Sequence, residues 1–324
     1  ALAVAAIRGG GVGSLPCAML SPDQIVAEAA AVRAEVTGPI NLNFFCHKSP
    51  TEADARQAAW RAALQPFYDE ERVVDAVPPP ERRPFDAAAA AAVAQVRPAI
   101  VSFHFGLPHA ALIARVRASG ALILGNATSV AEAEWLARAG CDAVIAQGFE
   151  AGGHAGWFLD AHCPVGTMAL VPQVVDAVDV PVIAAGGIAD PRGAAAAIAL
   201  GAAGVQVGTA YLRCTDSLTR AVHRRRLVGA GSGDSVFTNV FSGGIARGLP
   251  NRLIATRGAI GDHVPPFPLA AAALAPLRAR AEADGRDDFS PLWAGQAAPL
   301  ATGDDATALT MSLGDAALRQ KDLS

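Results

Sequence analysis

The sequence predicts an α/β protein built on a parallel sheet, and three observations support this prediction. Six short apolar runs rich in Val and Ile recur between residues 39 and 212, and alanine-rich segments with helical periodicity separate most of them. The apolar runs are continuous rather than alternating, which is typical of strands that are buried on both faces. With 324 residues, 52% of them hydrophobic, the chain is large enough for one barrel or two average domains.

The predicted strands and helices follow one another along the chain. A helix over residues 1–10 ends in glycine, and a short strand follows over residues 11–15. Six later strands are predicted over residues 39–45, 99–105, 121–127, 142–148, 181–187 and 204–210. The clearest helices between them cover residues 129–140, 169–178 and 190–201.

Seven predicted strands are one fewer than a closed TIM-type (β/α)8 barrel contains. We therefore expect the first strand of the barrel to precede Ala1, outside this numbering. The alternative is an open, doubly wound sheet, which predicts a GxGxxG turn after its first strand. No such turn is placed there, so the barrel is the favoured fold.

The alternation of predicted strands and helices stops after about residue 214, which suggests a boundary between two parts of the chain. Residues 1–214 are predicted to form the barrel. Glycine-rich stretches such as GAGSGDS and FSGGIARGLPNRL characterise residues 215–275, which we expect to form a smaller substrate-contacting cap over the barrel mouth. Residues 276–324 are predicted to form a helical tail that packs back on the barrel.

Composition argues against several classes of function. A net charge of −4 and a pI of about 6.0 give no reason to expect nucleic acid as a partner. No apolar run approaches the roughly 18 residues of a membrane span. The five cysteines are odd in number and contain no CxxC pair, which argues against disulfides and a metal site and fits the reducing cytoplasm. Oligomerisation stays open.

Two late strands end in glycines. The run AAGGI contains Gly186 and Gly187, and the run QVGTA begins at Gln206. Ligands of such barrels bind at the carboxyl ends of the strands, where glycine loops on late strands hold phosphate through converging backbone N–H groups. Each loop alone would indicate a tight turn, but the adjacent pair indicates a phosphate site.

The stretch AQGFEAGGHAG follows another predicted strand and places His154 among glycines. Glycines let the backbone lie against a flat ring, because no Cβ intervenes. Gln147 and Asn43 lie at the ends of two strands, and their amides can hydrogen-bond ring heteroatoms. A phosphate site beside an amide-lined floor describes flavin mononucleotide (FMN), with His154 facing the place where a substrate would sit.

The sequence resembles the nitronate monooxygenases, formerly called 2-nitropropane dioxygenases, over nearly its whole length. The shared segments are GGGVGSL, AQGFEAGGHAG, AAGGI, QVGT, ARGLPNRL and LWAGQ, of which AQGxEAGGHxG is the most specific. The resemblance implies that His154 is catalytic. It implies FMN-binding residues at Asn43, Gln147, Gly152, Gly153, Gly186, Gly187, Gln206, Val207, Gly208 and Thr209.

The resemblance also implies a reaction. Such an enzyme oxidises alkyl nitronates, or nitroalkanes where it accepts the neutral compound, with O2 to a carbonyl compound and nitrite through a flavin semiquinone. His154 would then orient the nitro oxygens or abstract the α-proton. An imidazole suits either role, because its unperturbed pKa is about 6.5.

Two rival functions remain at this point. A flavin-dependent enoyl-acyl carrier protein reductase shares the EAGGH loop and uses NAD(P)H. In such reductases, however, we expect an acidic residue at the position of Gln147, which favours the monooxygenase. A barrel that only binds a phosphorylated metabolite is the third hypothesis.

His47 and His104 lie near strand ends and are further candidates for the pocket. Three residues of the tail are predicted to reach back to the barrel mouth: Trp293, Gly295 and Gln296.

Overall fold

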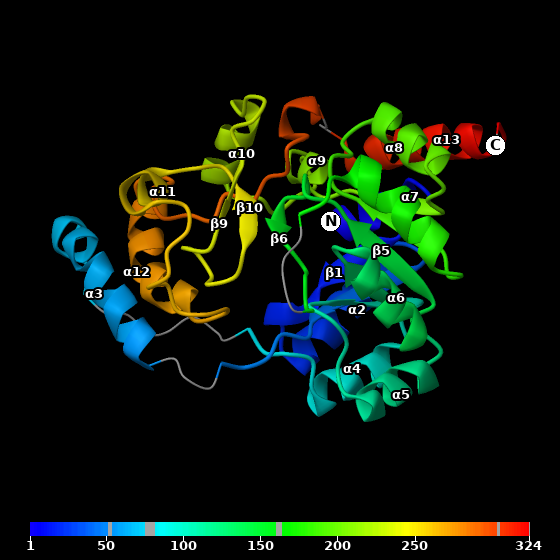
Figure 1. Ribbon diagram of the computed structural model, residues 1–324, viewed down its shortest axis with the longest axis horizontal. Helices are drawn as coiled ribbons and strands as arrows, with labels where there is room; N and C mark the ends of the chain where they lie inside the picture. Colours follow the sequence, from blue (N-terminus) through cyan, green and yellow to red (C-terminus); the bar gives the residue numbers. More distant parts are fainter. Residues whose placement is uncertain (51–53, 75–81, 160–163, 303–304, 324) are drawn as a thin grey trace.

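The computed structural model describes residues 1–50, 54–74, 82–159, 164–302 and 305–323. Its centre is a curled parallel sheet in which seven strands are ordered as they follow along the chain (Figure 1). The strands are β1 (Gly13–Pro16), β2 (Ile40–Phe45), β3 (Ile100–His104), β4 (Leu122–Ala127), β5 (Ala143–Gln147), β7 (Val182–Ala185) and β8 (Gly204–Gln206). Each strand overlaps one of the seven predicted runs, and the α/β barrel-type fold is confirmed.

Side chains alternate between the two faces of this sheet. Leu42 and Phe44 of β2 point outward into the main core beneath the helices. On the inner face, Leu124 and Ile145 in the middle of their strands belong to a small apolar cluster. Asn126 follows Leu124 on the same face, toward the carboxyl end of β4. On β4 and β5 the inner face therefore becomes polar toward the carboxyl ends, at Asn126 and Gln147, where a ligand would bind.

Helices cover the outer face of the sheet. They are α2 (Pro22–Glu35), α4 (Ala87–Val96), α5 (Ala110–Ala118), α6 (Val130–Arg138), α7 (Thr167–Ala177) and α8 (Pro191–Ala199). Asp86, Ser129 and Asp190 each accept a hydrogen bond from the first turn of the helix that follows, as N-cap residues do. Two short helical segments follow β1 and β8: η1 (Cys17–Met19) and α9 (Thr209–Leu212).

The sheet is open between its two edge strands. Within the described residues, β1 and β8 do not pair with each other. Helix α1 (Leu2–Arg8) packs on β1, and the tail helix α13 (Ala306–Lys321) packs on α1 and α8. The eighth strand that would close the barrel is not among the described strands and stays a prediction. No described helix is long and apolar enough to cross a membrane.

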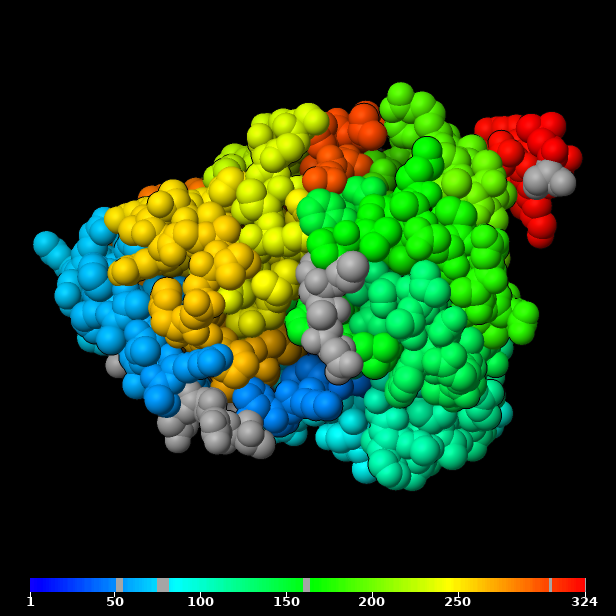
Figure 2. All heavy atoms as spheres, in the orientation of Figure 1, coloured from blue at the N-terminus to red at the C-terminus, as the bar shows by residue number. Residues whose placement is uncertain are grey.

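A second unit lies beside the sheet (Figure 1). Its own antiparallel sheet is ordered β6-β10-β9, with β6 (Gly153–His154), β9 (Val236–Thr238) and β10 (Ala246–Gly248). The helices of the unit are α3 (Asp54–Glu71), α10 (Ala221–Val228), α11 (Arg252–Arg257) and α12 (Ala270–Ala283), and the 310 helix η2 (Ala298–Leu300) follows. Figure 2 shows the blue α3 and the yellow and orange α11–α12 region massed at one end of the molecule.

Helix α3 comes from within the predicted barrel region, yet it packs in this second unit. Trp60 Nε1 donates to the Ala270 carbonyl at 3.2 Å, and Tyr68 Oη donates to the Ala273 carbonyl at 2.6 Å. Helix α12 also runs across residue 275, the predicted boundary between cap and tail. The divisions at residues 214 and 275 stay predictions, and we propose that the cap includes α3 and all of α12.

Candidate active site

Polar side chains line the inner face of the sheet along β1, β2 and β3. Ser102 Oγ accepts hydrogen bonds from Asn41 Nδ2 at 2.9 Å and from Asn43 Nδ2 at 2.8 Å. Asn41 Nδ2 also donates to Ser14 Oγ at 3.0 Å. The Oδ1 atom of Asn41 is buried without a partner among the described residues. The amide floor that the sequence predicted at Asn43 therefore extends over three strands and retains an unused acceptor.

Gln147, at the end of β5, holds the loop that follows it. Its Oε1 atom accepts from Asn126 Nδ2 at 3.0 Å and from the Gly156 amide at 2.8 Å. Its Nε2 atom donates to the His154 carbonyl at 2.9 Å. A carboxylate would keep the two acceptor contacts but would place an oxygen against that carbonyl. An amide is therefore the side chain that satisfies all three partners.

The close approach of two backbone segments explains one of the loop glycines. A Cβ atom at Gly152 would lie 2.6 Å from the Ala294 carbonyl carbon and closer still to the Gly295 amide nitrogen. The Gln296 amide donates to the Glu150 carbonyl at 2.9 Å. The tail residues 293–296 thus reach back to the barrel mouth as predicted. The sequence interpretation assigned the loop glycines to contact with a flat ring, but at Gly152 the nearest neighbour is this tail segment.

The acidic residue of the EAGGH loop has a structural partner. Both carboxylate oxygens of Glu150 accept from the Thr167 amide, at 3.0 and 2.8 Å, and one accepts from Thr167 Oγ1 at 2.9 Å. Thr167 begins α7, so the carboxylate lies at a helix N-terminus, where the exposed N–H groups and the dipole favour an anion. Glu150 is therefore already paired by the fold and holds the loop against α7.

The two predicted glycine loops lie side by side, because β7 and β8 are neighbours with Ala185 opposite Gln206. Gly186 and Gly187 adopt φ of 104° and 71°, a region that favours glycine. A Cβ atom at Gly208 would meet no atom within 4 Å. The structure thus brings residues 186–187 and 206–209 to one edge of the sheet, and Thr209 Oγ1 there accepts from the Gly295 amide at 2.9 Å.

His154 lies inside an enclosure of aromatic rings. It sits on β6, which pairs antiparallel with β10 so that His154 is opposite Ala246. Its Nε2 atom lies 2.8 Å from Ser242 Oγ. Four rings surround the imidazole at centroid distances of 6.1, 6.0, 5.0 and 5.4 Å, from Phe45, Phe105, Phe267 and Trp293 respectively. These rings come from barrel loops, the cap and the tail, so the enclosure exists only in the folded chain.

The enclosure keeps His154 neutral. Burial lowers the pKa of His154 well below its usual value, and the nearby Arg82, His104 and His47 lower it further. Burial also lowers the pKa of His104 to about 4, against an opposing hydrogen bond with the His154 backbone. Burial likewise lowers the pKa of His47. At neutral pH the imidazole of His154 is therefore available as a proton acceptor or as a neutral hydrogen-bond donor.

These histidines predict a loss of stability as the pH falls from 7 to 5. Each has a lower pKa folded than unfolded, so the unfolded chain binds protons first below about pH 6.5. With a folded pKa of about 4, His104 alone should lower the free energy of unfolding by about 2 kcal/mol at pH 5. Urea unfolding at pH 7, 6 and 5 measures this change. His104→Gln should flatten the profile, and a stability that rises toward pH 5 would contradict the assignment.

Sequence reasoning did not single out Arg82, Ser242 or Phe267. Arg82 and Phe267 lie in proline-containing loop sequences, RRPF and PPFP, and Ser242 precedes a glycine pair. None of these patterns specifies contact with a histidine on a distant loop. Among the described residues, no group of three or more His, Cys, Asp or Glu side chains is arranged to hold a metal ion.

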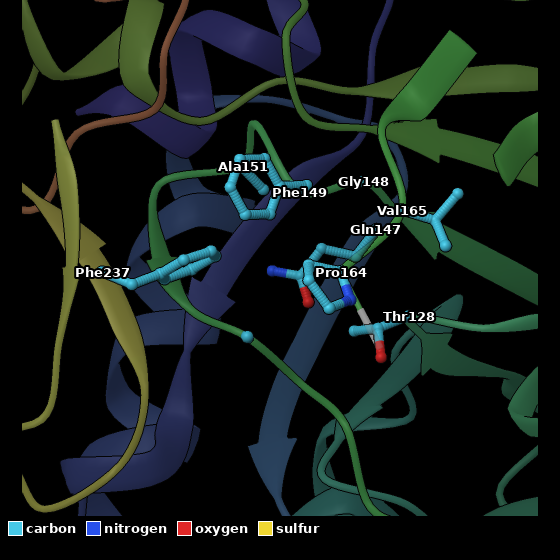
Figure 3. A pocket seen from close by; sticks show the side chains of 9 residues that line it. Thr128, Gln147, Gly148, Phe149, Ala151, Pro164, Val165 and Phe237 are labelled. Atoms are coloured by element: carbon cyan, nitrogen blue, oxygen red, sulfur yellow. The ribbon is translucent and has the colours of Figure 1, made fainter. Parts of the chain in front are cut away.

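A pocket of about 260 Å3, its open mouth included, borders Gln147. Figure 3 shows Phe149 and Phe237 on one side of it and Thr128 and Val165 on the other. The guanidinium of Arg247 stacks on both phenyl rings, 4.4 Å from the Phe149 centroid and 4.2 Å from the Phe237 centroid. Its Nε atom donates to the Phe149 carbonyl at 3.0 Å. Arg247 therefore ties the loop after β5 to the cap sheet.

Comparison with known proteins places the chain in a family. A model of the nitronate monooxygenase family matches residues 1–310. The chain belongs to this family of oxidoreductase enzymes. A nitronate monooxygenase from Paraburkholderia phytofirmans is 40% identical over 311 residues, which cover 93% of this chain and 84% of the relative. The nitronate monooxygenase of Pseudomonas aeruginosa is 39% identical, with 93% and 88% covered.

Solved structures show the same relationship. Nitroalkane oxidase from Streptomyces ansochromogenes superposes with a TM-score of 0.90 at 32% identity, covering 100% of this chain and 93% of that one. FabK from Thermotoga maritima superposes with a TM-score of 0.74 at 26% identity, covering 99% and 89%. This chain therefore superposes on both solved proteins over nearly its whole length.

Proposed function

We propose that this family member is an FMN-dependent nitronate monooxygenase that oxidises alkyl nitronates with O2 to a carbonyl compound and nitrite. Its relatives are named for nitronates, and a solved neighbour is named for nitroalkane oxidation. The observation that carries the proposal is the neutral His154 inside an aromatic enclosure, at the edge of an amide-lined floor. The one-electron route through the flavin, the choice of nitronate and a cytoplasmic location stay predictions.

The inner face of the barrel fits a flavin. The buried Oδ1 of Asn41 has no partner among the described residues, and the space around Gly208 is open. Asn43, Gln147, Gly152 and Gly153 would lie along the ring. The phosphate would be held by the two late-strand loops: Gly186, Gly187, Gln206, Val207, Gly208 and Thr209. When bound, FMN supplies the electron acceptor for the substrate and the group that reacts with O2.

His154 can act in two ways, which depend on its tautomer. If Nε2 carries the proton, it donates to Ser242 Oγ at 2.8 Å and leaves Nδ1 free to accept an α-proton. If Nδ1 carries the proton, Ser242 donates to Nε2, and the ring donates to a nitro oxygen instead. The aromatic rings lower the polarity of the surroundings in either arrangement, which strengthens these hydrogen bonds.

Anaerobic stopped-flow spectroscopy tests the function. The purified protein is mixed separately with propyl-2-nitronate and with NADPH while the flavin absorbance is recorded. A spectral change with the nitronate and none with NADPH is the expected result. Bleaching by NADPH would indicate the enoyl-acyl carrier protein reductase instead. A protein without a flavin spectrum would favour the barrel that only binds a phosphorylated metabolite.

The variant Gly208→Ala is expected to weaken FMN binding by about tenfold or more and to leave the fold intact. A methyl group at residue 208 meets no protein atom, and the backbone φ of −115° suits alanine. The methyl would instead fill the space that we assign to phosphate. Gly204→Ala is the matched control, because its Cβ is equally free at the opposite end of β8.

Titration of both apoproteins with FMN, followed by flavin fluorescence, measures the two dissociation constants. Thermal unfolding of the apoproteins should show the same midpoint for both variants. Equal FMN affinities would remove Gly208 from the phosphate site.

A further inference from the structure

Arg82 shares a packing partner with two of the site histidines. Its Cζ atom lies 5.8 Å from the centre of the Phe267 ring. The rings of His47 and His154 lie 4.8 and 5.0 Å from the same centre. The segment that carries Arg82 is anchored nearby, because the Phe85 amide donates to the carbonyl at the end of β2 at 2.8 Å. The guanidinium therefore packs on the same ring as the two histidines, and its charge reaches His154, whose pKa it lowers.

The charge of Arg82 has no counter-ion in the described part of the chain. The guanidinium is half-buried, burial alone lowers its pKa, and no carboxylate opposes that shift. Three other part-buried arginines of this protein have carboxylate partners, Arg226 with Asp287, Arg252 with Glu70 and Arg286 with Glu71, and Arg224 and Arg257 instead donate to backbone carbonyls. For the Arg82 guanidinium, the described residues provide neither kind of partner. Leaving a part-buried cation unpaired costs free energy. A site that keeps such a cation beside neutral histidines is suited to an anion.

We propose that Arg82 binds the nitro oxygens of the substrate and selects the nitronate anion over the neutral nitroalkane. The inference rests on the proposed function and names the residue that recognises the charge. A nitronate carries its negative charge on two coplanar oxygens, which the planar fork of a guanidinium can bind together, as it binds a carboxylate. His154, kept neutral by the same surroundings, then contacts the substrate without competing for that charge.

Arg82 is proposed to bind the substrate, whereas the amide floor is proposed to bind the flavin. The loss of Arg82 should therefore change substrate affinity and leave flavin binding unchanged. A neutral nitroalkane has the same shape and the same two oxygens but no net charge. Removal of Arg82 should therefore weaken binding of the anion and leave the neutral compound nearly unaffected. Packing lost with the side chain would instead affect both compounds equally.

The experiment compares Arg82→Met and Arg82→Lys with Arg83→Met in the FMN-loaded enzyme. Arg83 is the exposed neighbour, so its replacement removes the same charge outside the site. For Arg82→Met we expect KM for propyl-2-nitronate to rise about 10- to 100-fold, with kcat changed less than about threefold and KM for 2-nitropropane unchanged. Arg82→Lys should retain part of the affinity, and Arg83→Met should behave as the wild type.

A second measurement does not depend on turnover. Nitrate, a planar anion, should raise the thermal midpoint of the wild type and of Arg83→Met but not of Arg82→Met. Equal losses for nitronate and nitroalkane, or a nitrate response that survives in Arg82→Met, would overturn the proposal. If the wild type binds nitrate through Arg82 but does not oxidise nitronates, the anion site stands and the proposed function fails.

Discussion

Replacement of His154 with alanine should lower kcat for propyl-2-nitronate by about 10^2- to 10^4-fold and leave FMN bound. The imidazole is a neutral proton acceptor inside the aromatic enclosure, and its Nε2 atom lies 2.8 Å from Ser242 Oγ in the cap. Its side chain is not required for the contact between Gln147 and the loop, because that bond goes to the His154 carbonyl. Single-turnover kinetics and the flavin content of the purified variant measure the two effects.

Ser242→Ala provides a graded comparison for this experiment. It removes the hydroxyl 2.8 Å from Nε2 but keeps the imidazole, so we expect a smaller loss of about tenfold. The pH profile of the wild type should show no loss of activity near pH 6.5, because the pKa of His154 lies well below that value. If His154→Ala is purified without flavin, the histidine holds the cofactor rather than serving the chemistry.

Replacement of Gly152 with alanine should destabilise the contact between the loop after β5 and the tail. The added carbon would lie 2.6 Å from the Ala294 carbonyl carbon, and backbone atoms cannot turn away as a flexible side chain can. The loop and the tail must separate, which breaks the bonds from the Gln296 amide to Glu150 and from the Gly295 amide to Thr209. We expect a loss of about 3 kcal/mol in unfolding free energy.

Urea unfolding of the purified protein measures that loss. Gly314→Ala is the matched control, because its Cβ meets no atom within 4 Å in the middle of α13. That change should stabilise the helix by up to about 1 kcal/mol. If Gly152→Ala is as stable as the wild type, the tail does not press against the loop as the structure indicates.

The strands of the barrel could be predicted because each carries its own signal. A run such as VIAA at residues 182–185 is continuous, apolar and bounded by glycine or proline. Parallel strands that follow one another place their carboxyl ends at one edge, so Gly187 and Gly208 could be brought together without a structure. The same reasoning placed Asn43 and Gln147 at the ends of two strands, beside the predicted ligand.

The cap could not be predicted in the same way, because its contacts join distant parts of the chain. Nothing in the α3 sequence indicates that Trp60 donates to a carbonyl 210 residues later. Arg82 and Phe267 meet for the same reason. The role of Glu150 was also hidden, since its partner Thr167 opens a helix 17 residues further along. Long-range side-chain pairing, rather than local pattern, decides these positions.

The pairing of β6 with β10 means that the barrel and the cap are not interchangeable parts. His154 and Gly153 complete the cap sheet from the barrel side, opposite Ala246 and Arg247. A chimaera that received the cap of a relative would therefore have to re-form a ladder containing the proposed catalytic residue. We therefore expect single substitutions in the aromatic enclosure to change the range of accepted substrates more readily than exchange of the whole cap.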